Sequence, residues 1–186
     1  MLALAVAVTL AGCGGGPSSP AGQMTEPSDP PAPLPPGWGA FANFQRGFSF
    51  GVPPSWSVSE PPATTRVSSG DRGLVIAVAA DRSATGRTGD LGSYLTATVH
   101  ALPGYSGVVA AAPRALGGLR YPAEELDARG RFSATGVDQA IRAIALDRPG
   151  LVTYTLLIFR NADVAATRYA SDEAELLRTF RALAPD

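Results

Sequence analysis

A proline-rich segment near the N-terminus limits which part of this chain can fold. Residues 14–37 begin with Gly14-Gly15-Gly16-Pro17 and carry six more prolines from Pro27 to Pro36, with hardly any large apolar side chains. Such a stretch buries too little surface to offset the entropy lost on ordering. We therefore expect a tether over residues 13–37 and one folded domain over residues 38–186, a usual length for a single domain.

The only cysteine, Cys13, closes the tetrapeptide Leu10-Ala11-Gly12-Cys13, and the apolar run Met1–Ala11 leads into it. The pattern resembles a bacterial lipobox. It implies a signal peptide over residues 1–12, cleavage between Gly12 and Cys13, and a diacylglyceryl group on the Cys13 thiol. The run is shorter than the roughly 20 residues of a membrane span. No Arg or Lys precedes it, so we expect the start codon to lie upstream of Met1. The alternative is a buried free cysteine.

Composition excludes several classes of function. The chain has 15 basic and 16 acidic residues and a net charge of −1, whereas nucleic-acid-binding domains usually carry a clear basic excess. We expect no nucleic-acid partner. With one cysteine there is no internal disulfide, and a core of this size does not need one. We expect no cofactor beyond the covalent lipid, and a monomer.

Several segments alternate apolar and small polar residues in the manner of strands. Residues 48–52 and 55–58 are two short candidates, separated by Pro53-Pro54. The continuous apolar run at residues 73–80 predicts a strand covered on both faces. Further strands are expected at residues 108–112 and 119–128. A hairpin is expected from residues 137–146 and 151–160, with Pro149 and Gly150 in a type II turn.

Two segments have helical spacing. Leu91, Leu95 and Val99 predict a helix over residues 90–102, capped by Asp90 and ended by Pro103-Gly104. A second helix is predicted over residues 172–183, with Ser171 as its N-cap. The order of elements indicates an α+β fold, an antiparallel sheet flanked by two helices.

The segment Gly47–Trp56 is close to the opening pattern F-S-V-x-V-P-x-x-W of a known family. Together with Gly117-Gly118 and the closing Thr179-Phe180-Arg181, it resembles the PsbP-like family, in particular the actinobacterial lipoproteins of the LpqN type, over about residues 42–184. The resemblance implies a non-enzymatic binding or assembly role and supplies no catalytic residue.

Few residues suggest chemistry. His100, the only histidine, falls opposite the apolar stripe of its helix, where we expect it to be solvated. Ser106 lacks the second glycine of a nucleophile elbow, and we expect it to be a loop residue. Glu125 and Asp127 share a strand face, where they are an acid–base pair, hard-cation ligands or a solvated surface. One histidine and an acylated cysteine cannot build a transition-metal shell, so we expect no metal site.

Four residues ahead of the first confident strand form a candidate ligand site. Trp38, Phe41 and Phe44 are spaced three apart and line the mouth of an apolar groove in this hypothesis, with Arg46 as a polar anchor. The alternative is that the aromatic rings belong to the core.

The sequence therefore predicts a lipoprotein on the outer face of the cytoplasmic membrane, in the cell envelope. Its membrane contact is the lipid anchor, and its partner is an envelope protein or a lipid. The first hypothesis is non-enzymatic binding or scaffolding. The second is a lipid or glycolipid carrier, and the third an envelope hydrolase, for which the residues offer little support.

Overall fold

The computed structural model describes residues 28–83 and 90–184, which form two antiparallel sheets and two α-helices. The larger sheet has the order β3-β4-β5-β10-β9-β8-β6, with β7 also paired to β8, and the smaller sheet is β1-β2-β11. The strands are β1 (Gly39–Asn43), β2 (Phe48–Val52), β3 (Ser57–Ser59), β4 (Thr65–Ser68), β5 (Leu74–Asp81), β6 (Tyr105–Ala110), β7 (Arg114–Ala115), β8 (Ala123–Phe132), β9 (Val137–Arg148), β10 (Val152–Asn161) and β11 (Arg181–Ala182). The helices are α1 (Leu91–His100), α2 (Ala170–Thr179) and the preceding 3₁₀ helix η2 (Ala166–Tyr169). The expected α+β class is confirmed.

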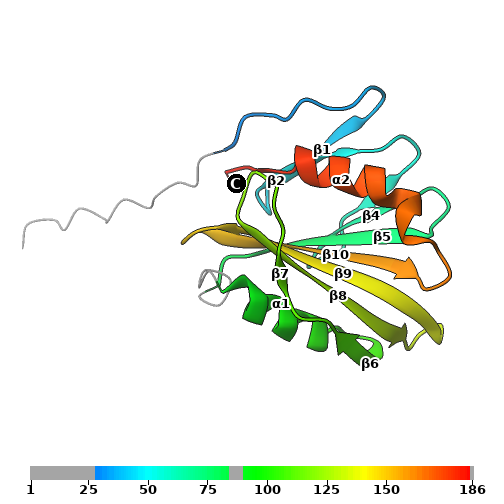
Figure 1. The fold of residues 1–186 in the computed structure, drawn as a ribbon. Helices are drawn as coiled ribbons and strands as arrows, with labels where there is room; N and C mark the ends of the chain where they lie inside the picture. The colour runs from blue at the N-terminus through cyan, green and yellow to red at the C-terminus, as the bar shows by residue number, and fades with distance from the viewer. Residues whose placement is uncertain (1–27, 84–89, 185–186) are drawn as a thin grey trace, which may run out of the picture.

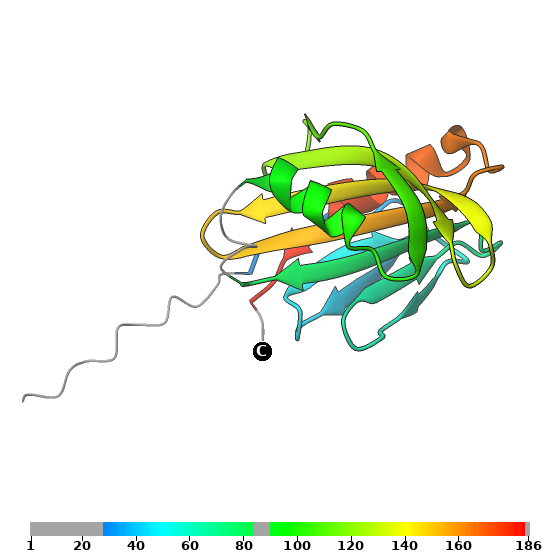
Figure 2. The same cartoon turned by 90° about the horizontal axis from the view of Figure 1, so that it is seen from below.

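The elements stack in three layers. Figure 1 shows α1 on one face of the large sheet, and α2 with the small sheet on the other. In Figure 2, seen from below, α1 crosses the sheet over its β8–β9 side and leaves the β5 side uncovered. Within the described ranges, no helix has the length and apolar character needed to cross a membrane.

A separate core fills the space on each side of the large sheet. The core under α2 includes Phe48, Tyr154 and Phe180, whose rings pack against one another at centroid distances of 5.1–6.1 Å. The core under α1 joins the helix to β8 and β9 through Leu95 and Leu126. Buried side chains pack together on both sides of the large sheet.

Helix α1 forms where the sequence predicts it. The Asp90 side chain accepts a hydrogen bond from the Ser93 amide at 3.1 Å, as an N-cap should. Leu91, Leu95 and Val99 are buried against the sheet. His100 is exposed, as expected.

The β9–β10 hairpin also matches the expectation. The Leu151 amide donates to the Arg148 carbonyl at 2.9 Å, which places Pro149 and Gly150 at the two central positions of the turn. Gly150 has φ +74°, the positive value that the third position of a type II turn requires.

The C-terminal helix differs from its prediction. It spans Ala170–Thr179, and Ser171 lies inside it without capping it. Phe180 is extended, and Arg181–Ala182 then pair with β2. The apolar spacing of Phe180 and Leu183 continues the helical period, but the residues between them, Arg181 and Ala182, pair with the edge of β2.

Other strands were missed or displaced. The sequence prediction omitted β1, β4 and β7. It started β6 three residues too late and β8 four residues too early. These elements are short edge strands or contain few large apolar residues. Their pairing partners, and not their own pattern, decide their bounds.

Residues 28–37, which the sequence assigned to the tether, lie against the domain. The Asp29 amide donates to the Ala182 carbonyl at 2.8 Å. The Asp29 carboxylate accepts from Tyr121 and pairs with Arg120 at 3.2 Å. Arg178 donates to the Pro33 carbonyl at 3.1 Å. Polar contacts therefore hold this segment, which we call the strap (residues 28–37), where apolar burial alone would not.

Candidate functional site

The four residues of the predicted groove have different surroundings in the structure. Trp38 and Phe41 pack against the core beneath α2, and the Phe41 ring lies 5.2 Å from that of Phe50. Phe44 is 54% exposed in the turn after β1. The Arg46 guanidinium donates to the carbonyls of Pro61 and Pro62 at 2.9 and 2.8 Å, which fixes it on a loop. Gly12 and Cys13 lie outside the described residues.

Glu125 and Asp127 lie in a network of ion pairs. Glu125 is buried and bonds to Arg142 at 2.6 Å and to Arg114 at 3.0 Å. Arg114 also reaches Asp127 at 2.8 Å. Arg142 in turn approaches Glu173 of α2 at 3.4 Å. Each carboxylate is paired with an arginine. The ion pairs therefore have a structural role, because they connect β7, β8, β9 and α2.

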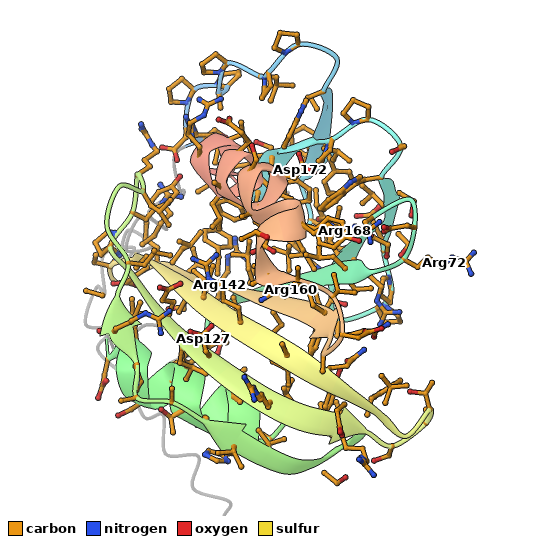
Figure 3. The ribbon with its side chains drawn as sticks, turned by 45° about the vertical axis from the view of Figure 1, so that its right-hand side comes forward. Arg72, Asp127, Arg142, Arg160, Arg168 and Asp172 are labelled. Atoms are coloured by element: carbon orange, nitrogen blue, oxygen red, sulfur yellow. The ribbon has the colours of Figure 1, made fainter. Side chains whose placement is uncertain are left out.

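Glu173 is the unusual member of this network. It is 4% exposed, and its Oε1 atom has no hydrogen-bond partner among the described residues. Burial raises the pKa of the Glu173 carboxyl, against the opposing effect of Arg142 and Arg160. Figure 3 shows both arginines on the sheet at the foot of α2.

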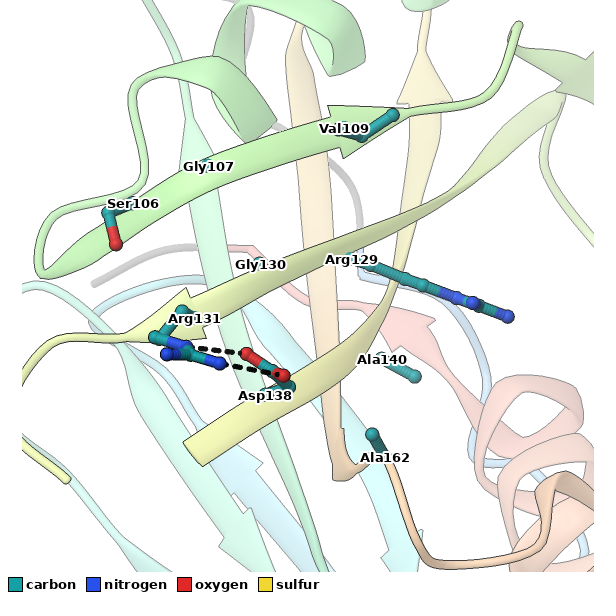
Figure 4. A pocket seen from close by; sticks show the side chains of 9 residues that line it. All are labelled: Ser106, Gly107, Val109, Arg129, Gly130, Arg131, Asp138, Ala140 and Ala162. Carbon is teal, nitrogen blue, oxygen red and sulfur yellow. Dashed lines mark hydrogen bonds and ion pairs between the residues drawn. The ribbon is translucent and has the colours of Figure 1, made fainter. Parts of the chain in front are cut away.

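Beyond this network the sheet face is open and charged. The hollow has a volume of about 660 Å³ and lies between β6, β8 and β9. Figure 4 shows Arg131 paired with Asp138 on one side, at 2.8 Å, and Arg129 projecting on the other. Ser106 lies at its edge, in β6, whereas the sequence placed it in a loop. We call this hollow the charged groove.

The opposite face of the sheet carries a different hollow, beside the end of α1. It has a volume of about 430 Å³ and a mainly apolar lining. Strands β5 and β10 form its floor, the residues that follow α1 form one wall, and β6 and β8 close one end. Its lining residues are Thr64, Arg66, Val75, Ala77, Leu102, Pro103, Tyr105, Phe132, Gln139, Leu157 and Phe159. We call it the apolar trough.

The trough exists because one face of β5 is uncovered. Leu74, Ile76 and Val78 are buried beneath α2, but Val75 and Ala77 on the other face are only half-buried. The sequence prediction that this strand is covered on both faces was therefore wrong. Helix α1 packs over β8 and β9 and stops short of β5, so apolar side chains stay accessible along the floor.

Aromatic residues shape the closed end of the trough. The Tyr105 ring stacks on Phe159 at a centroid distance of 5.5 Å and lies 5.2 Å from Phe132. Its hydroxyl donates to the Gln139 side chain. Burial raises the pKa of Tyr105 to about 12, with Arg66 acting in the opposite direction. At neutral pH the hydroxyl is therefore protonated and serves as a hydrogen-bond donor.

The open side of the trough has a single cation. Strand register places Leu157, Ala77 and Arg66 in one row across β10, β5 and β4. The row passes from apolar to charged as it nears the sheet edge. The arrangement suits a molecule with an apolar chain and a polar or anionic end, since small-molecule sites combine apolar walls with a few polar groups.

Sequence reasoning missed this site for a physical reason. Its floor is formed by β5 and β10, which are about 80 residues apart in the sequence. The pattern of each strand is typical of a strand in a hydrophobic core. The usable signal was the run at residues 73–80, which is apolar at every position although only one of its faces is packed.

The fold is shared with solved structures of low sequence identity. Cyanobacterial PsbP from Synechocystis sp. PCC 6803 superposes with a TM-score of 0.55 and 14% identity, over 90% of this chain and 99% of that one. The fold is PsbP-like. The Ran-binding protein Mog1p of Saccharomyces cerevisiae gives a TM-score of 0.52 and 10% identity, over 77% and 94% of the two chains.

Two other matches are less complete. LpqN of Mycobacterium tuberculosis, described as involved in cell envelope biogenesis, gives a TM-score of 0.46 and 15% identity, over 74% of this chain and 83% of that one. A Bacteroides thetaiotaomicron protein matches at a TM-score of 0.55 and 10% identity over 77% of this chain, which spans 47% of its length. Neither a protein-family model nor a curated protein matches the sequence.

Proposed function

We propose that this protein is a cell-envelope lipoprotein, anchored through Cys13 to the outer face of the cytoplasmic membrane, whose domain binds the apolar part of an amphiphilic ligand without catalysing a reaction. The observation that carries the binding role is the apolar trough. Its volume of about 430 Å³ lies within the range of roughly 300–1,000 Å³ typical of small-molecule sites.

The shape of the trough favours recognition over full enclosure. Both cores are packed with side chains, and the trough lies on the outside of the sheet, open along the β4 side. A ligand there would keep part of its surface in water. This supports a binding protein ahead of a carrier that shields its cargo.

The groups around the trough also argue against catalysis. The titratable side chains that line it are Tyr105 and Arg66. A hydroxyl with a pKa near 12 is a poor base at neutral pH, and the arginine side chain has hydrogen-bond donors but no acceptor. A general acid–base mechanism needs a group that titrates near the working pH.

The apolar role is tested with a neutral probe. Dodecanol should displace the fluorophore 1-N-phenylnaphthylamine from the purified full chain. Ala77→Phe, which fills the floor of the trough, should weaken binding of both molecules by tenfold or more. Ala140→Phe is the matched control, because Ala140 is also half-buried but lies in the charged groove. Equal affinities for the two variants would refute the site.

The anchor is tested separately. Wild-type chain expressed in a bacterium and fed radiolabelled palmitate should carry the label and sediment with membranes. Cys13→Ala should lose both properties. A Cys13→Ala protein that stays in the membrane fraction would contradict the proposed lipidation.

A second candidate function is scaffolding through the charged groove. Val109 is 72% exposed on β6, directly opposite Arg129 on β8, and an exposed apolar residue beside charges is common at protein interfaces. A photo-crosslinking residue at position 109 should then capture one defined envelope protein in cells, and Arg129→Glu should abolish that product. Ala77→Phe should leave it unchanged.

A further inference from the structure

A small polar pocket adjoins the open side of the apolar trough. It has a volume of about 390 Å³ and is formed by the turn before β3, by β4 and by the β4–β5 turn. Arg66 and Val75 line both hollows. The two therefore form one continuous surface, apolar over β5 and β10 and polar at the sheet edge.

Strand register explains the change in character. Phe159, Val75, Ser68 and Ser57 follow one another across β10, β5, β4 and β3 on the same face. Phe159 and Val75 line the trough, whereas Ser68 and Ser57 contribute hydroxyl groups to the polar pocket. One row of side chains thus joins an aromatic floor to a pair of serines.

The pocket is rich in hydrogen-bond donors that its own neighbours do not use. Among the described residues, Arg66 and Arg72 form no ion pair with a carboxylate, and the hydroxyls of Ser57 and Ser68 form no hydrogen bond. Arg72 extends from its turn into solvent at the rim (Figure 3). The nearby Asp71 is already engaged, because it accepts from Ser69 and Tyr169 and pairs with Arg168.

Two residues of the pocket have strained backbone. Ser55 has φ +67° and Arg72 has φ +59°, the two positive values held by residues other than glycine in the described ranges. Glycine takes seven other such positions. The two side chains line the same hollow, and strain of this kind is retained mainly where a site needs the side chain.

We propose that this pocket binds a phosphate group, and that the alkyl chain of the same molecule lies in the apolar trough. Arginine and serine hydroxyls together donate hydrogen bonds to a phosphate from several directions. The inference rests on the proposed function for the alkyl chain, whereas the phosphate contacts belong to the polar pocket alone. Phosphate is available as a lipid head group or as a free ion, and the experiment separates these sources.

The experiment titrates the ¹⁵N-labelled full chain with inorganic phosphate and with dodecyl phosphate while amide shifts are recorded. Inorganic phosphate should shift the amides of Ser55–Ser57 and Ser68–Gly73 with a millimolar Kd. Arg66→Gln and Arg72→Gln should each weaken it fivefold or more. Arg129→Gln, an exposed arginine on the opposite face, should bind like the wild type.

Dodecyl phosphate distinguishes the two sources. Tenfold or tighter binding than inorganic phosphate, with the gain removed by Ala77→Phe, supports a lipid head group. Equal affinities would assign the pocket to a free phosphate ion and overturn the joint site. Absence of shifts in these segments, or unchanged affinity in both arginine variants, would overturn the phosphate pocket. Dodecanol binding that persisted in that case would leave the proposed function standing.

Arg72→Gly is a second test of phosphate binding by the Arg72 side chain, in which weaker binding cannot be explained by a less stable protein. Glycine relieves the positive φ, so this variant should have a higher Tm than the wild type while phosphate binding weakens at least fivefold. A stabilised variant that kept its affinity would show that the Arg72 side chain has no part in binding.

Discussion

Gly73 is required by the packing of η2 against the β4–β5 turn. A Cβ atom at this position would lie 2.3 Å from the Tyr169 hydroxyl, which bonds to Asp71 at 2.7 Å. We expect Gly73→Ala to lower the free energy of unfolding by about 2 kcal/mol, because the hydroxyl must move and its hydrogen bonds must break. Urea denaturation measures the change. Gly39→Ala, where a Cβ meets open space, should change stability by less than half as much.

At Ser55 the reverse substitution, from serine to glycine, should stabilise the protein. The Ser55 φ of +67° falls at the third position of a turn in which the Trp56 amide donates to the Pro53 carbonyl at 3.3 Å. Glycine has no Cβ penalty there, so Ser55→Gly should raise the free energy of unfolding by about 0.5–1 kcal/mol after its own entropy loss. A destabilised variant, measured by thermal or urea unfolding, would mean that the serine side chain supports the turn.

Elements that the sequence predicted correctly have a local cause. Asp90 caps α1, and Pro149-Gly150 determines the β9–β10 turn. Helix α2 was predicted to extend too far because Phe180 fits the helical spacing, and its apolar character alone does not distinguish helix from strand. The edge of β2, about 130 residues earlier in the sequence, pairs with Arg181 and Ala182 and gives this segment its extended conformation.

The contact between α2 and the large sheet should depend on pH through Glu173. Burial raises the pKa of this carboxyl above its ordinary value of 4.5. The protonated Glu173 carboxyl therefore makes its full contribution to the free energy of unfolding below about pH 4.5. This contribution is lost as the pH rises through the folded-state pKa. We expect Glu173→Gln to be more stable than the wild type at pH 7.

The same comparison at acid pH is the check. Well below pH 4.5 the wild-type carboxyl is protonated in both the folded and the unfolded states, so the two proteins should unfold alike there. Chemical denaturation at a series of pH values gives both curves. A constant difference across the series would show that the substitution acts through packing and not through charge.

At the scale of the whole molecule, the strap fastens the N-terminal segment to the last strand. Asp29 bonds to Tyr121, and the Ala182 amide donates to the Tyr121 hydroxyl at 2.8 Å. We expect Asp29→Ala to lower the free energy of unfolding by about 1–2 kcal/mol. A double-mutant cycle with Tyr121→Phe should give a coupling energy above about 0.5 kcal/mol. Additive losses would show that the two side chains act independently.

The candidate site shows where sequence reasoning stops. Val75, Ala77, Leu157 and Phe159 were all recognised as strand residues, but nothing in their order reveals that α1 covers β8 and β9 and leaves β5 open. Trp38 and Phe41 gave the stronger local signal for a ligand groove, yet they pack against the core. A surface hollow depends on which elements fail to cover one another, and that is a property of the assembled layers.

The strap and the apolar trough lie on opposite faces of the domain. The strap runs on the layer of α2 and the small sheet, whereas the trough opens on the layer of α1 (Figure 1). From Cys13 to Ser28 there are 15 residue steps, or at most about 50 Å of chain. The chain therefore enters the domain on the face opposite the trough, and a ligand can occupy the trough without displacing the strap.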